Sequence, residues 1–307
     1  MITTEDATHA LGAWGARLGP GFFSIHEQRP DRLWLVEAGD GQRFVLKRAR
    51  EMVPADTLDV LRSRGIPVAL PIAADDGDRF KIDGDANWTL YEHLPGVTVT
   101  DHLAPGASER AVQCGEAIGQ LHVALASISG PGRSVLDLPG VVRGAAASPP
   151  IAVAPELVRV WQESKTRLPS MLDGLPTHLI HRDPNPANML FHDGTLSGWV
   201  DFDLAMVGPR IFDPCYCASA ILSQCPEAPE LRAQWTPVAI DLLTAYHRVV
   251  HLTAHERGAL GATLMAIQIL FAEFSHAQGR DDLADRDMLT LQWLDQTWSQ
   301  WNLFDRH

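Results

Sequence analysis

Cysteine is scarce in this sequence of 307 residues. The four that occur are Cys114, Cys215, Cys217 and Cys225. Cys215 and Cys217 are two positions apart in a predicted helix, so their side chains point to different faces. The spacing of the four fits neither a disulfide framework nor a zinc motif. We therefore expect buried, free thiols in a reducing cytoplasm, with a disulfide or a metal site as the alternative.

Basic residues are outnumbered by acidic ones. The sequence has 25 Lys and Arg against 38 Asp and Glu, a formal net charge of −13. This balance disfavours nucleic acid and anionic membranes as partners, because both carry negative charge. It favours a cationic small molecule, although an acidic surface also serves solubility alone.

The sequence also lacks a long uninterrupted hydrophobic run. The longest apolar stretch, Ala259 to Phe274, is broken by Thr263, Gln268 and Glu273, which is typical of a core helix and not of a membrane span. No basic segment followed by an apolar run stands at the N-terminus, so no signal peptide is predicted. Hydrophobic residues make up 46% of the chain, which is enough for a globular protein with a sizeable core.

The most informative stretch present is His181-Arg-Asp-Pro-Asn-Pro-Ala-Asn188, followed thirteen residues later by Asp201-Phe-Asp203. Before it, residues 178–181 form a short apolar run typical of a strand. Between its two parts, residues 189–200 predict a β-hairpin around a His-Asp-Gly turn. We expect this hairpin to bring Asp183, Asn188 and Asp201 to one end of a small sheet. Carboxylate and amide oxygens are hard ligands that suit Mg²⁺ and phosphate chemistry.

The pattern H-x-D-x-x-x-x-N followed by D-x-D resembles the catalytic core of kinases with the protein-kinase-like fold. It resembles most the bacterial aminoglycoside phosphotransferase and choline kinase group, over roughly Phe22 to Ala220. The resemblance implies an α+β, two-lobed fold with a small antiparallel β-sheet N-lobe and a mainly helical C-lobe. We expect a nucleotide-binding lobe over residues 1–93 and a helical catalytic and substrate lobe over 94–307. A chance polar turn beside a hairpin is the alternative explanation.

Hydrophobic patterns outline both lobes. Apolar or alternating runs predict small-lobe strands at 22–27, 33–37, 42–47, 68–73, 79–82 and 88–92. Helical periodicity predicts helices at 7–18, 55–64, 108–126, 156–168, 214–223, 238–251, 257–276 and 287–302, and a Gly- and Pro-rich loop over 129–150. Within the helix predicted over 108–126, we expect His122 to be a core histidine.

The resemblance assigns the nucleotide site to two places in the N-lobe. Lys47, at the end of Phe44-Val-Leu-Lys47, corresponds to the lysine that holds the α- and β-phosphates of ATP. Backbone groups of Glu92, His93 and Leu94 correspond to the hinge that contacts adenine. The acidic partner of Lys47 is left open among Glu51, Asp56 and Asp59. The loop between the first two strands has no G-x-G-x-x-G pattern. Within the resemblance Arg29 or Arg32 is a candidate phosphate contact, and an ordinary hairpin loop is the favoured alternative.

The resemblance also gives roles to the central motif. Asp183 corresponds to the catalytic base. Asn188 and Asp201 correspond to ligands of Mg²⁺ bridging the β- and γ-phosphates, and Asp203 to a ligand of a second metal ion. His181 and Asp213 correspond to structural supports of the catalytic loop.

Two features point away from a protein substrate. Asn185 stands where protein kinases usually carry a lysine, and only nine residues separate Asp203 from Asp213, too few for an activation segment. We therefore predict a cytoplasmic, ATP- and Mg²⁺-dependent phosphotransferase that acts on a hydroxyl of a small molecule such as an aminoglycoside, an amino alcohol or a sugar. A non-catalytic kinase-like binding or structural protein is the alternative.

The sequence leaves several points open. The acceptor, the choice of ATP or GTP and the oligomeric state are not fixed by any motif. Glu273, Asp282 and Asp285 are candidates to bind a substrate amine, with plain surface charge as the alternative. His247, His251 and His255 recur at four-residue spacing, which permits a zinc site on a continuous helix, although a helix junction near residue 254 argues against it.

Overall fold

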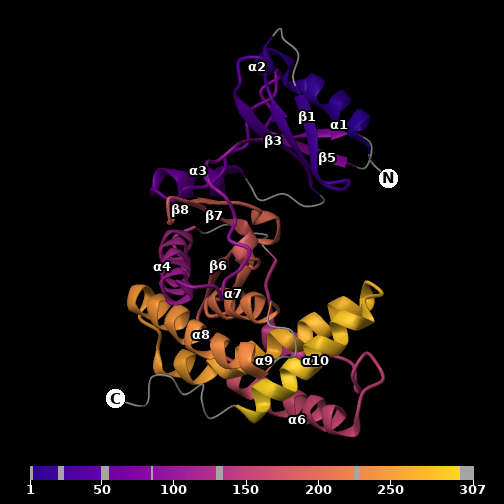
Figure 1. Ribbon diagram of the computed structural model, residues 1–307, viewed down its shortest axis with the longest axis vertical. Coiled ribbons are helices and arrows are strands. Elements are labelled where there is room, and N and C mark those ends of the chain that lie inside the picture. The colour runs from indigo at the N-terminus through magenta and orange to yellow at the C-terminus, as the bar shows by residue number, and fades with distance from the viewer. Residues whose placement is uncertain are drawn as a thin grey trace. The chain divides into compact units, whose positions relative to one another are not determined.

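A computed structural model describes residues 3–19, 24–49, 55–83, 86–128, 134–224 and 229–297 (Figure 1). The chain forms two compact units. Unit 1 comprises Met1–Thr98 and Asn188–Leu204, and unit 2 comprises Val99–Ala187 and Ala205–His307. Unit 1 is therefore assembled from two stretches that are far apart in the sequence.

Unit 1 is built on a five-stranded antiparallel sheet in the order β1-β2-β3-β5-β4. Its strands are β1 (Ser24–Arg29), β2 (Leu33–Glu37), β3 (Arg43–Ala49), β4 (Lys81–Asp83) and β5 (Ala86–Glu92), and its helices are α1 (Thr4–Leu11), α2 (Gly15–Leu18) and α3 (Ala55–Ser63). A capping box fixes the start of α1, because Thr3 and Asp6 satisfy each other's backbone N–H groups. The helix therefore begins three residues before the predicted range of 7–18.

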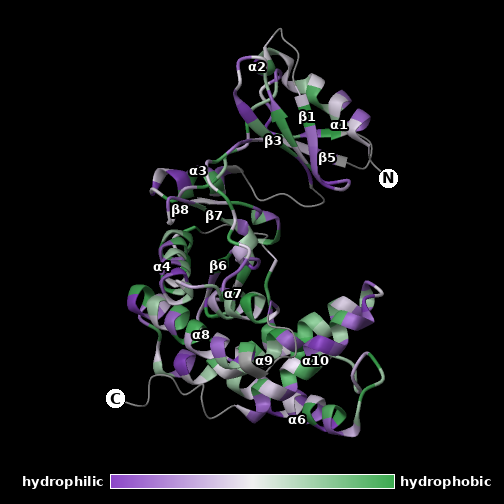
Figure 2. Cartoon of the chain, viewed as in Figure 1, coloured by the Kyte–Doolittle hydropathy of each residue, from purple (hydrophilic) through white to green (hydrophobic). Residues whose placement is uncertain are grey.

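One face of this sheet carries the core of unit 1. Trp34, Phe44, Leu46, Trp88 and Leu90 are buried there against apolar side chains of α1 and α2. The Trp34 and Trp88 rings lie 5.3 Å apart between centroids. Figure 2 shows the hydrophobic middle of β3 that supplies two of these residues. Side chains alternate along a strand, so the intervening residues of β3 and β5 belong to the opposite face.

The second stretch of unit 1 is a β-hairpin. Strands β7 (Met189–His192) and β8 (Thr195–Trp199) pair antiparallel, as the sequence predicted. The Trp199 N–H donates to the Pro67 carbonyl at 2.7 Å, and Val97 pairs with Phe191 as an isolated bridge. These bonds tie the hairpin to the N-terminal stretch.

Unit 2 is mainly helical. Its helices are α4 (Ala107–Leu125), α5 (Leu138–Gly144), α6 (Pro155–Leu172), α7 (Phe212–Leu222), α8 (Pro229–Val250), α9 (Ala254–Ala277) and α10 (Asp281–Gln296), and its short ribbon pairs β6 (Thr177–Ile180) with β9 (Met206–Pro209). Helices α4 and α8 pack closely because Gly115 and Gly119 of α4 face Leu242 and Val249 of α8, where a Cβ atom would clash.

Four observed segments differ from the predicted elements. Residues 68–73 form isolated bridges and not a strand, while α5 lies inside the segment predicted as a loop. Helix α8 begins before Pro237 and continues through it, although proline usually ends a helix. Helix α10 begins at Asp281, six residues before the predicted start, and Asp281 and Asp282 suit the positive end of its dipole.

Within the described residues, α9 is the one helix long and apolar enough to cross a membrane. It carries mostly hydrophobic residues (Figure 2), and 72% of its most apolar window is buried. Its capping box at Thr253 and Glu256 and its neighbours α6, α7 and α10 identify it as a core helix of unit 2, as the interrupted apolar run predicted.

Candidate active site

In unit 1, Lys47 projects from the face of the sheet opposite the helix-covered core. Phe44 and Leu46 are buried in that core, so Lys47, an odd number of positions away, points to the other side. Lys47 pairs in register with Thr89 of β5, and Tyr91 lies two positions further along the same strand. All three residues therefore share one face.

Two carboxylates meet the Lys47 ammonium group. Its Nζ lies 2.6 Å from Asp201 Oδ1 and 2.7 Å from Asp203 Oδ1, and the lysine is 7% exposed. Both aspartates follow directly after β8, and Phe202 between them is buried. Asp201 has a φ of 64°, a left-handed conformation that is uncommon outside glycine and typical of functional turns. The predicted D-x-D segment is thus brought to the predicted lysine.

The electrostatics of this cluster favour a further positive charge. Burial raises the pKa of Asp203, and the neighbouring Asp201 carboxylate adds to the shift, whereas Lys47 opposes it. Arg32, from the turn between β1 and β2, lies 4.0 Å from Asp203. Burial, followed by the charges of Asp203 and Asp201, also raises the pKa of Tyr91. Two carboxylates that share one ammonium group in a half-buried setting provide the oxygen ligands that a divalent cation prefers.

The acidic residues predicted beside Lys47 lie elsewhere. Asp59 accepts from Arg79 at 2.6 Å, and Asp56 is exposed on α3. Glu51 lies outside the described residues. The ion pairs of Lys47 within the described chain are with Asp201 and Asp203, carboxylates from the second stretch of unit 1.

The predicted hinge residues Glu92, His93 and Leu94 follow β5. The Glu92 N–H donates to the Leu70 carbonyl at 3.1 Å, and its carboxylate accepts from Arg62 at 2.6 Å. The three residues line a cavity of about 330 Å³ together with Arg17, Gln42, Arg43, Phe44 and Ile72. Since Phe44 belongs to the core face of the sheet, this cavity does not adjoin Lys47.

Asn188 begins the second stretch of unit 1 and is 2% exposed. Its carbonyl accepts from the Val200 N–H at 3.1 Å. This bond holds the backbone of Asn188 beside the residue that precedes Asp201. The predicted metal ligands Asn188 and Asp201 are therefore fixed at the same end of the β7–β8 hairpin.

In unit 2, a buried aspartate braces the loop that carries Asp183. Asp213, at the start of α7, is fully buried and accepts from the His181 N–H at 2.8 Å and the Arg182 N–H at 2.9 Å. His122 Nε2 lies 2.8 Å from the same carboxylate. Arg182 has a φ of 67°, a strained conformation that these backbone bonds stabilise.

His122 extends this brace into the helical core. Its Nδ1 lies 2.8 Å from the Tyr246 hydroxyl, which donates to the Arg210 carbonyl at 3.1 Å. The His178 ring lies edge-on to His122, and burial followed by the charge of His122 lowers the pKa of His178 to about 4. The expectation of a core histidine at position 122 is confirmed, with the addition that its partners include Asp213.

Asp183 is held by polar neighbours of its own unit. Asn185 Nδ2 donates to Asp183 Oδ1 at 3.2 Å, and the Asp183 N–H donates to His181 Nδ1 at 3.3 Å. The Tyr216 hydroxyl also hydrogen-bonds the Asp183 side chain; burial, then this carboxylate, raises the pKa of Tyr216. Tyr216 was not predicted as a site residue. The sequence signal that could have identified Tyr216 is its position one turn after Asp213 on an apolar helix.

These features, a lysine between two carboxylates and an aspartate on a braced loop, agree with the comparisons made with known proteins. The model of the phosphotransferase enzyme family matches residues 25–249, more than half of the chain. The chain belongs to the phosphotransferase enzyme family. It is a small-molecule kinase whose acceptor group is an alcohol. The family resemblance inferred from the central motif is confirmed.

Sequence relatives of this phosphotransferase include the homoserine kinase of Azorhizobium caulinodans, 30% identical over 231 residues that cover 71% of this chain and 70% of the relative. Among solved structures, a microcompartment-associated aminopropanol kinase has a TM-score of 0.74 at 18% identity and covers 98% of this chain and 99% of its own. An amicoumacin kinase in complex with AMP-PNP, Ca²⁺ and amicoumacin has a TM-score of 0.70 at 17% identity. The match covers 97% of this chain and 94% of the amicoumacin kinase. These likenesses confirm the predicted α+β, protein-kinase-like fold.

Other predicted ligands in the phosphotransferase are not brought together. His247 lies on α8 and His255 on α9, with His251 in the connection between them. His247 Nδ1 accepts from the Leu252 N–H at 3.0 Å, which closes the end of α8. No group of three or more His, Cys, Asp or Glu side chains within the described residues is arranged to hold a metal ion. Cys114, Cys215 and Cys217 are buried free thiols, and Cys225 lies outside the described residues.

Proposed function

We propose that this kinase transfers the γ-phosphoryl group of ATP to the hydroxyl of a small alcohol that also bears an amine, with homoserine as the first acceptor to test. The observation that carries the proposal is the Lys47 ammonium group held between Asp201 and Asp203. Curated relatives named homoserine kinases and a solved structure named an aminopropanol kinase support the choice of acceptor. The formal charge of −13 agrees with an acceptor that carries a positive charge.

The residues of unit 1 fit a nucleotide and its metal ion. In the proposed complex, Lys47 exchanges its carboxylate partners for the α- and β-phosphates, and the backbone of Glu92, His93 and Leu94 contacts adenine. Asn188, Asp201 and Asp203 offer the hard oxygen ligands that Mg²⁺ prefers, and their shared end of the hairpin makes them a matching set. Mg²⁺ bound there neutralises charge on the phosphates.

Asp183 is the proposed catalytic base. It orients the acceptor hydroxyl and takes its proton as phosphoryl transfer proceeds. Asn185 and Tyr216 hold the carboxylate in one orientation through their bonds to it. Asp213 and His181 act on the backbone of the loop and are positioning residues. Precise placement of this kind accounts for a large share of the rate in phosphoryl transfer.

The proposal includes the organisation of the chain. Residues 1–93 are the proposed nucleotide-binding lobe, and 94–307 the proposed catalytic and substrate lobe. The unit boundaries add the hairpin of Asn188–Leu204 to the same body as the first stretch. Buried thiols at Cys114, Cys215 and Cys217 agree with a cytoplasmic enzyme.

The alternative is a kinase-like protein that binds nucleotide without turnover. The turn between β1 and β2 supports it, because Pro30, Asp31 and Arg32 stand where a glycine-rich loop is expected in kinases. Arg32 near Asp203 argues for catalysis, because it offers a positive charge at the same place.

The test is ADP release with Mg²⁺-ATP over homoserine, aminopropanol, choline, ethanolamine and aminoglycosides. We compare the wild-type chain with Asp183→Asn and with Asp173→Asn, an exposed control. Turnover on one acceptor, lost by a factor of about 10² to 10⁴ in Asp183→Asn and kept in the control, supports the proposal. ATP binding with no turnover on any acceptor supports the alternative.

A further inference from the structure

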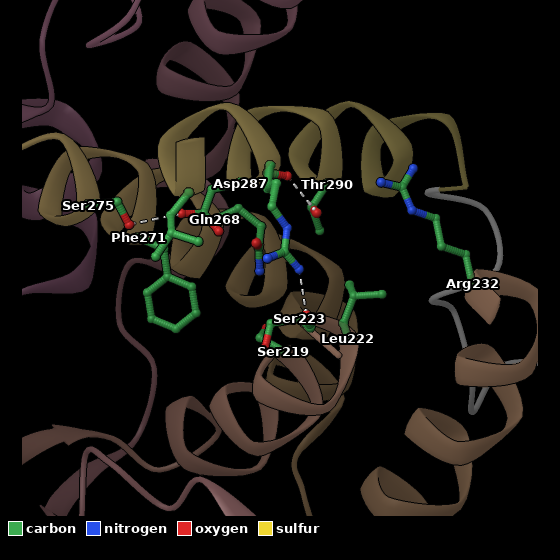
Figure 3. A pocket seen from close by; sticks show the side chains of 11 residues that line it. Ser219, Leu222, Ser223, Arg232, Gln268, Phe271, Ser275, Asp287 and Thr290 are labelled. Carbon is green, nitrogen blue, oxygen red and sulfur yellow. Dashed lines mark hydrogen bonds between the residues drawn. The ribbon is translucent and has the colours of Figure 1, made fainter. Parts of the chain in front are cut away.

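Unit 2 encloses a cavity of about 220 Å³ among α7, α8, α9 and α10 (Figure 3). At about 30 Å³ for each water molecule, it has room for roughly seven of them. It therefore fits a ligand with a similar number of non-hydrogen atoms. None of the residues that line it belongs to the cluster around Lys47 or to the Asp183 loop.

Two buried polar groups in the cavity wall lack a partner. Ser219 Oγ of α7 and Gln268 Nε2 of α9 have no hydrogen-bond partner within the described residues, and the two side chains are 2% and 3% exposed. Buried polar groups are nearly always hydrogen-bonded, to protein, water or ligand. Figure 3 shows both lining one space, with Asp287 of α10 on its other side. The cavity is thus polar at several points of its wall.

The wall also carries charges of both signs. Ser275 donates to the Asp287 carboxylate at 3.3 Å, and Arg286 donates to the Ser223 carbonyl at 2.7 Å. Arg232 adds a second guanidinium group, which lies over the Trp293 ring. A guanidinium group has five N–H donors, so Arg286 has more donors than its bond to Ser223 uses. One carboxylate with two guanidinium groups suits a zwitterion better than a simple amine.

Aromatic contacts connect the cavity to the catalytic loop. The Tyr216 hydroxyl bonds to Asp183, and the Tyr216 ring lies edge-on to Phe271, with 5.3 Å between centroids. Phe271 lines the cavity. Ser219 lies one turn beyond Tyr216 on α7. A side chain that lines the cavity, Phe271, therefore contacts the tyrosine that is bonded to the proposed base.

We infer that this cavity binds the amino-acid end of the acceptor, with Asp287 holding its ammonium group and with Gln268 and Arg286 holding its carboxylate. The inference rests on the proposed function and narrows the acceptor from amine-bearing alcohols to α-amino-acid alcohols. Burial raises the pKa of Asp287 to about 7, although Ser275 and the charge of Arg286 oppose the shift, and an ammonium group bound beside it would stabilise the ionised carboxylate. Ser219 supplies a hydrogen bond to either end of the ligand.

The experiment uses two variants and two matched acceptors. Asp287→Asn removes the charge for the ammonium group, and Gln268→Glu replaces the donor for the carboxylate with a negative charge. Homoserine is compared with 3-aminopropan-1-ol, which has the same hydroxyl and amine but no carboxylate. Asp173→Asn, an exposed change at the end of α6 in the same unit, is the control, and thermal unfolding checks that each variant is folded.

In the wild type we expect kcat/KM for homoserine to exceed that for 3-aminopropan-1-ol by about 10-fold or more, the factor that one charged contact contributes. Asp287→Asn raises KM for both acceptors by about 10-fold, whereas Gln268→Glu raises it for homoserine alone. KM for ATP stays unchanged in both. If either folded variant matches the control on homoserine, the inference is wrong while phosphotransfer stands.

Calorimetric binding separates the inference from the proposed function. If the wild type turns over no acceptor, the proposed function fails, and homoserine binding is then measured directly. Binding that Asp287→Asn weakens and Asp173→Asn retains still supports the cavity. No binding to the wild type, or equal binding to both variants, overturns it and indicates a cavity filled by water.

Discussion

Unit 1 and unit 2 each contain carboxylates that are partly or fully buried, but the groups that bind these carboxylates differ. Asp213 of unit 2 is fully buried and bound by two backbone N–H groups and the His122 ring. Asp201 and Asp203 of unit 1 are bound to one lysine side chain. Backbone donors cannot move away without unfolding the loop, whereas a lysine has a flexible stem. The comparison separates a carboxylate that fixes a backbone from a pair that can exchange partners.

The largest expected effect is on the fixed carboxylate. Asp213→Ala removes the acceptor of three buried donors, so the free energy of unfolding should fall by about 3 to 5 kcal/mol. Urea unfolding followed by circular dichroism measures it. Asp173→Ala, at an exposed position at the end of α6, is the control. A loss in Asp213→Ala of no more than about 1 kcal/mol would show that the brace is not structural.

The exchangeable pair should respond in activity and not in stability. Asp201→Asn keeps a hydrogen bond to Lys47 but removes a charge, so kcat/KM should fall by about 10² to 10³. The free energy of unfolding should change by about 1 kcal/mol or less. Steady-state kinetics and urea unfolding on the same preparation measure both. If Asp201→Asn lost both activity and stability, Asp201 would be a structural carboxylate like Asp213, and the proposed difference between the two units would be wrong.

The helix that carries His122 offers a smaller test. Gly115→Ala on α4 places a Cβ atom against the Leu242 backbone of α8, and this overpacking should cost about 1 to 3 kcal/mol. Gly258→Ala on α9 meets open space and should stabilise the chain by about 0.5 to 1 kcal/mol. Thermal unfolding shifts of opposite sign are expected. If both variants shifted the unfolding temperature in the same direction, the contact between α4 and α8 would be looser than the structure shows.

The pH dependence of the free energy of unfolding tests a third carboxylate, Asp287. Burial raises its pKa from 3.8 to about 7, although Ser275 and Arg286 act in the opposite direction. The folded chain therefore binds this proton between about pH 4 and 7 while the unfolded chain has released it. Stability should fall as pH rises through this window, by up to about 1.4 kcal/mol per pH unit. Asp287→Asn should flatten that slope, and an equal slope in urea unfolding from pH 5 to 7 would contradict it.

The sequence predicted the fold because its central motif has fixed spacing. The β7–β8 hairpin lies where the turn signal predicted it, and both D-x-D carboxylates meet the lysine predicted to share their site. The family and the fold class are confirmed. The chemical roles of these residues and the division at residue 93 stay predictions.

The described ion pairs of Lys47 are with two carboxylates that the sequence did not suggest as its partners, Asp201 and Asp203. Glu51, Asp56 and Asp59 were candidates because they are near in sequence, whereas Asp201 is 154 residues away. Sequence proximity cannot rank carboxylates that tertiary packing selects. Pro237 misled in a similar way, since a proline that argues against a helix in isolation is accepted inside α8 by its packing.

Asp287 could have been found from the pattern of α10. Leu283, Leu291 and Leu294 lie eight and three positions apart on one apolar stripe, and Asp287, midway between the first two, lies within that stripe. An acidic residue in an apolar stripe predicts a buried charge that has a functional role. Asp282 and Asp285, which drew attention as candidates, are exposed, and Glu273 accepts from the Ala146 N–H at 2.6 Å.

The discontinuity of unit 1 has a consequence for synthesis on the ribosome. Trp199 and Phe191 are 1% and 6% exposed within a body whose sheet ends near residue 92. A nascent chain of about one hundred residues therefore emerges with its sheet complete and this hairpin missing. The first body remains unfinished until residue 204 has left the exit tunnel, by which time α4 and α6 of the second body are already made. Expressed alone, residues 1–98 would leave the Pro67 carbonyl and the edge at Val97 without the strands that cover them.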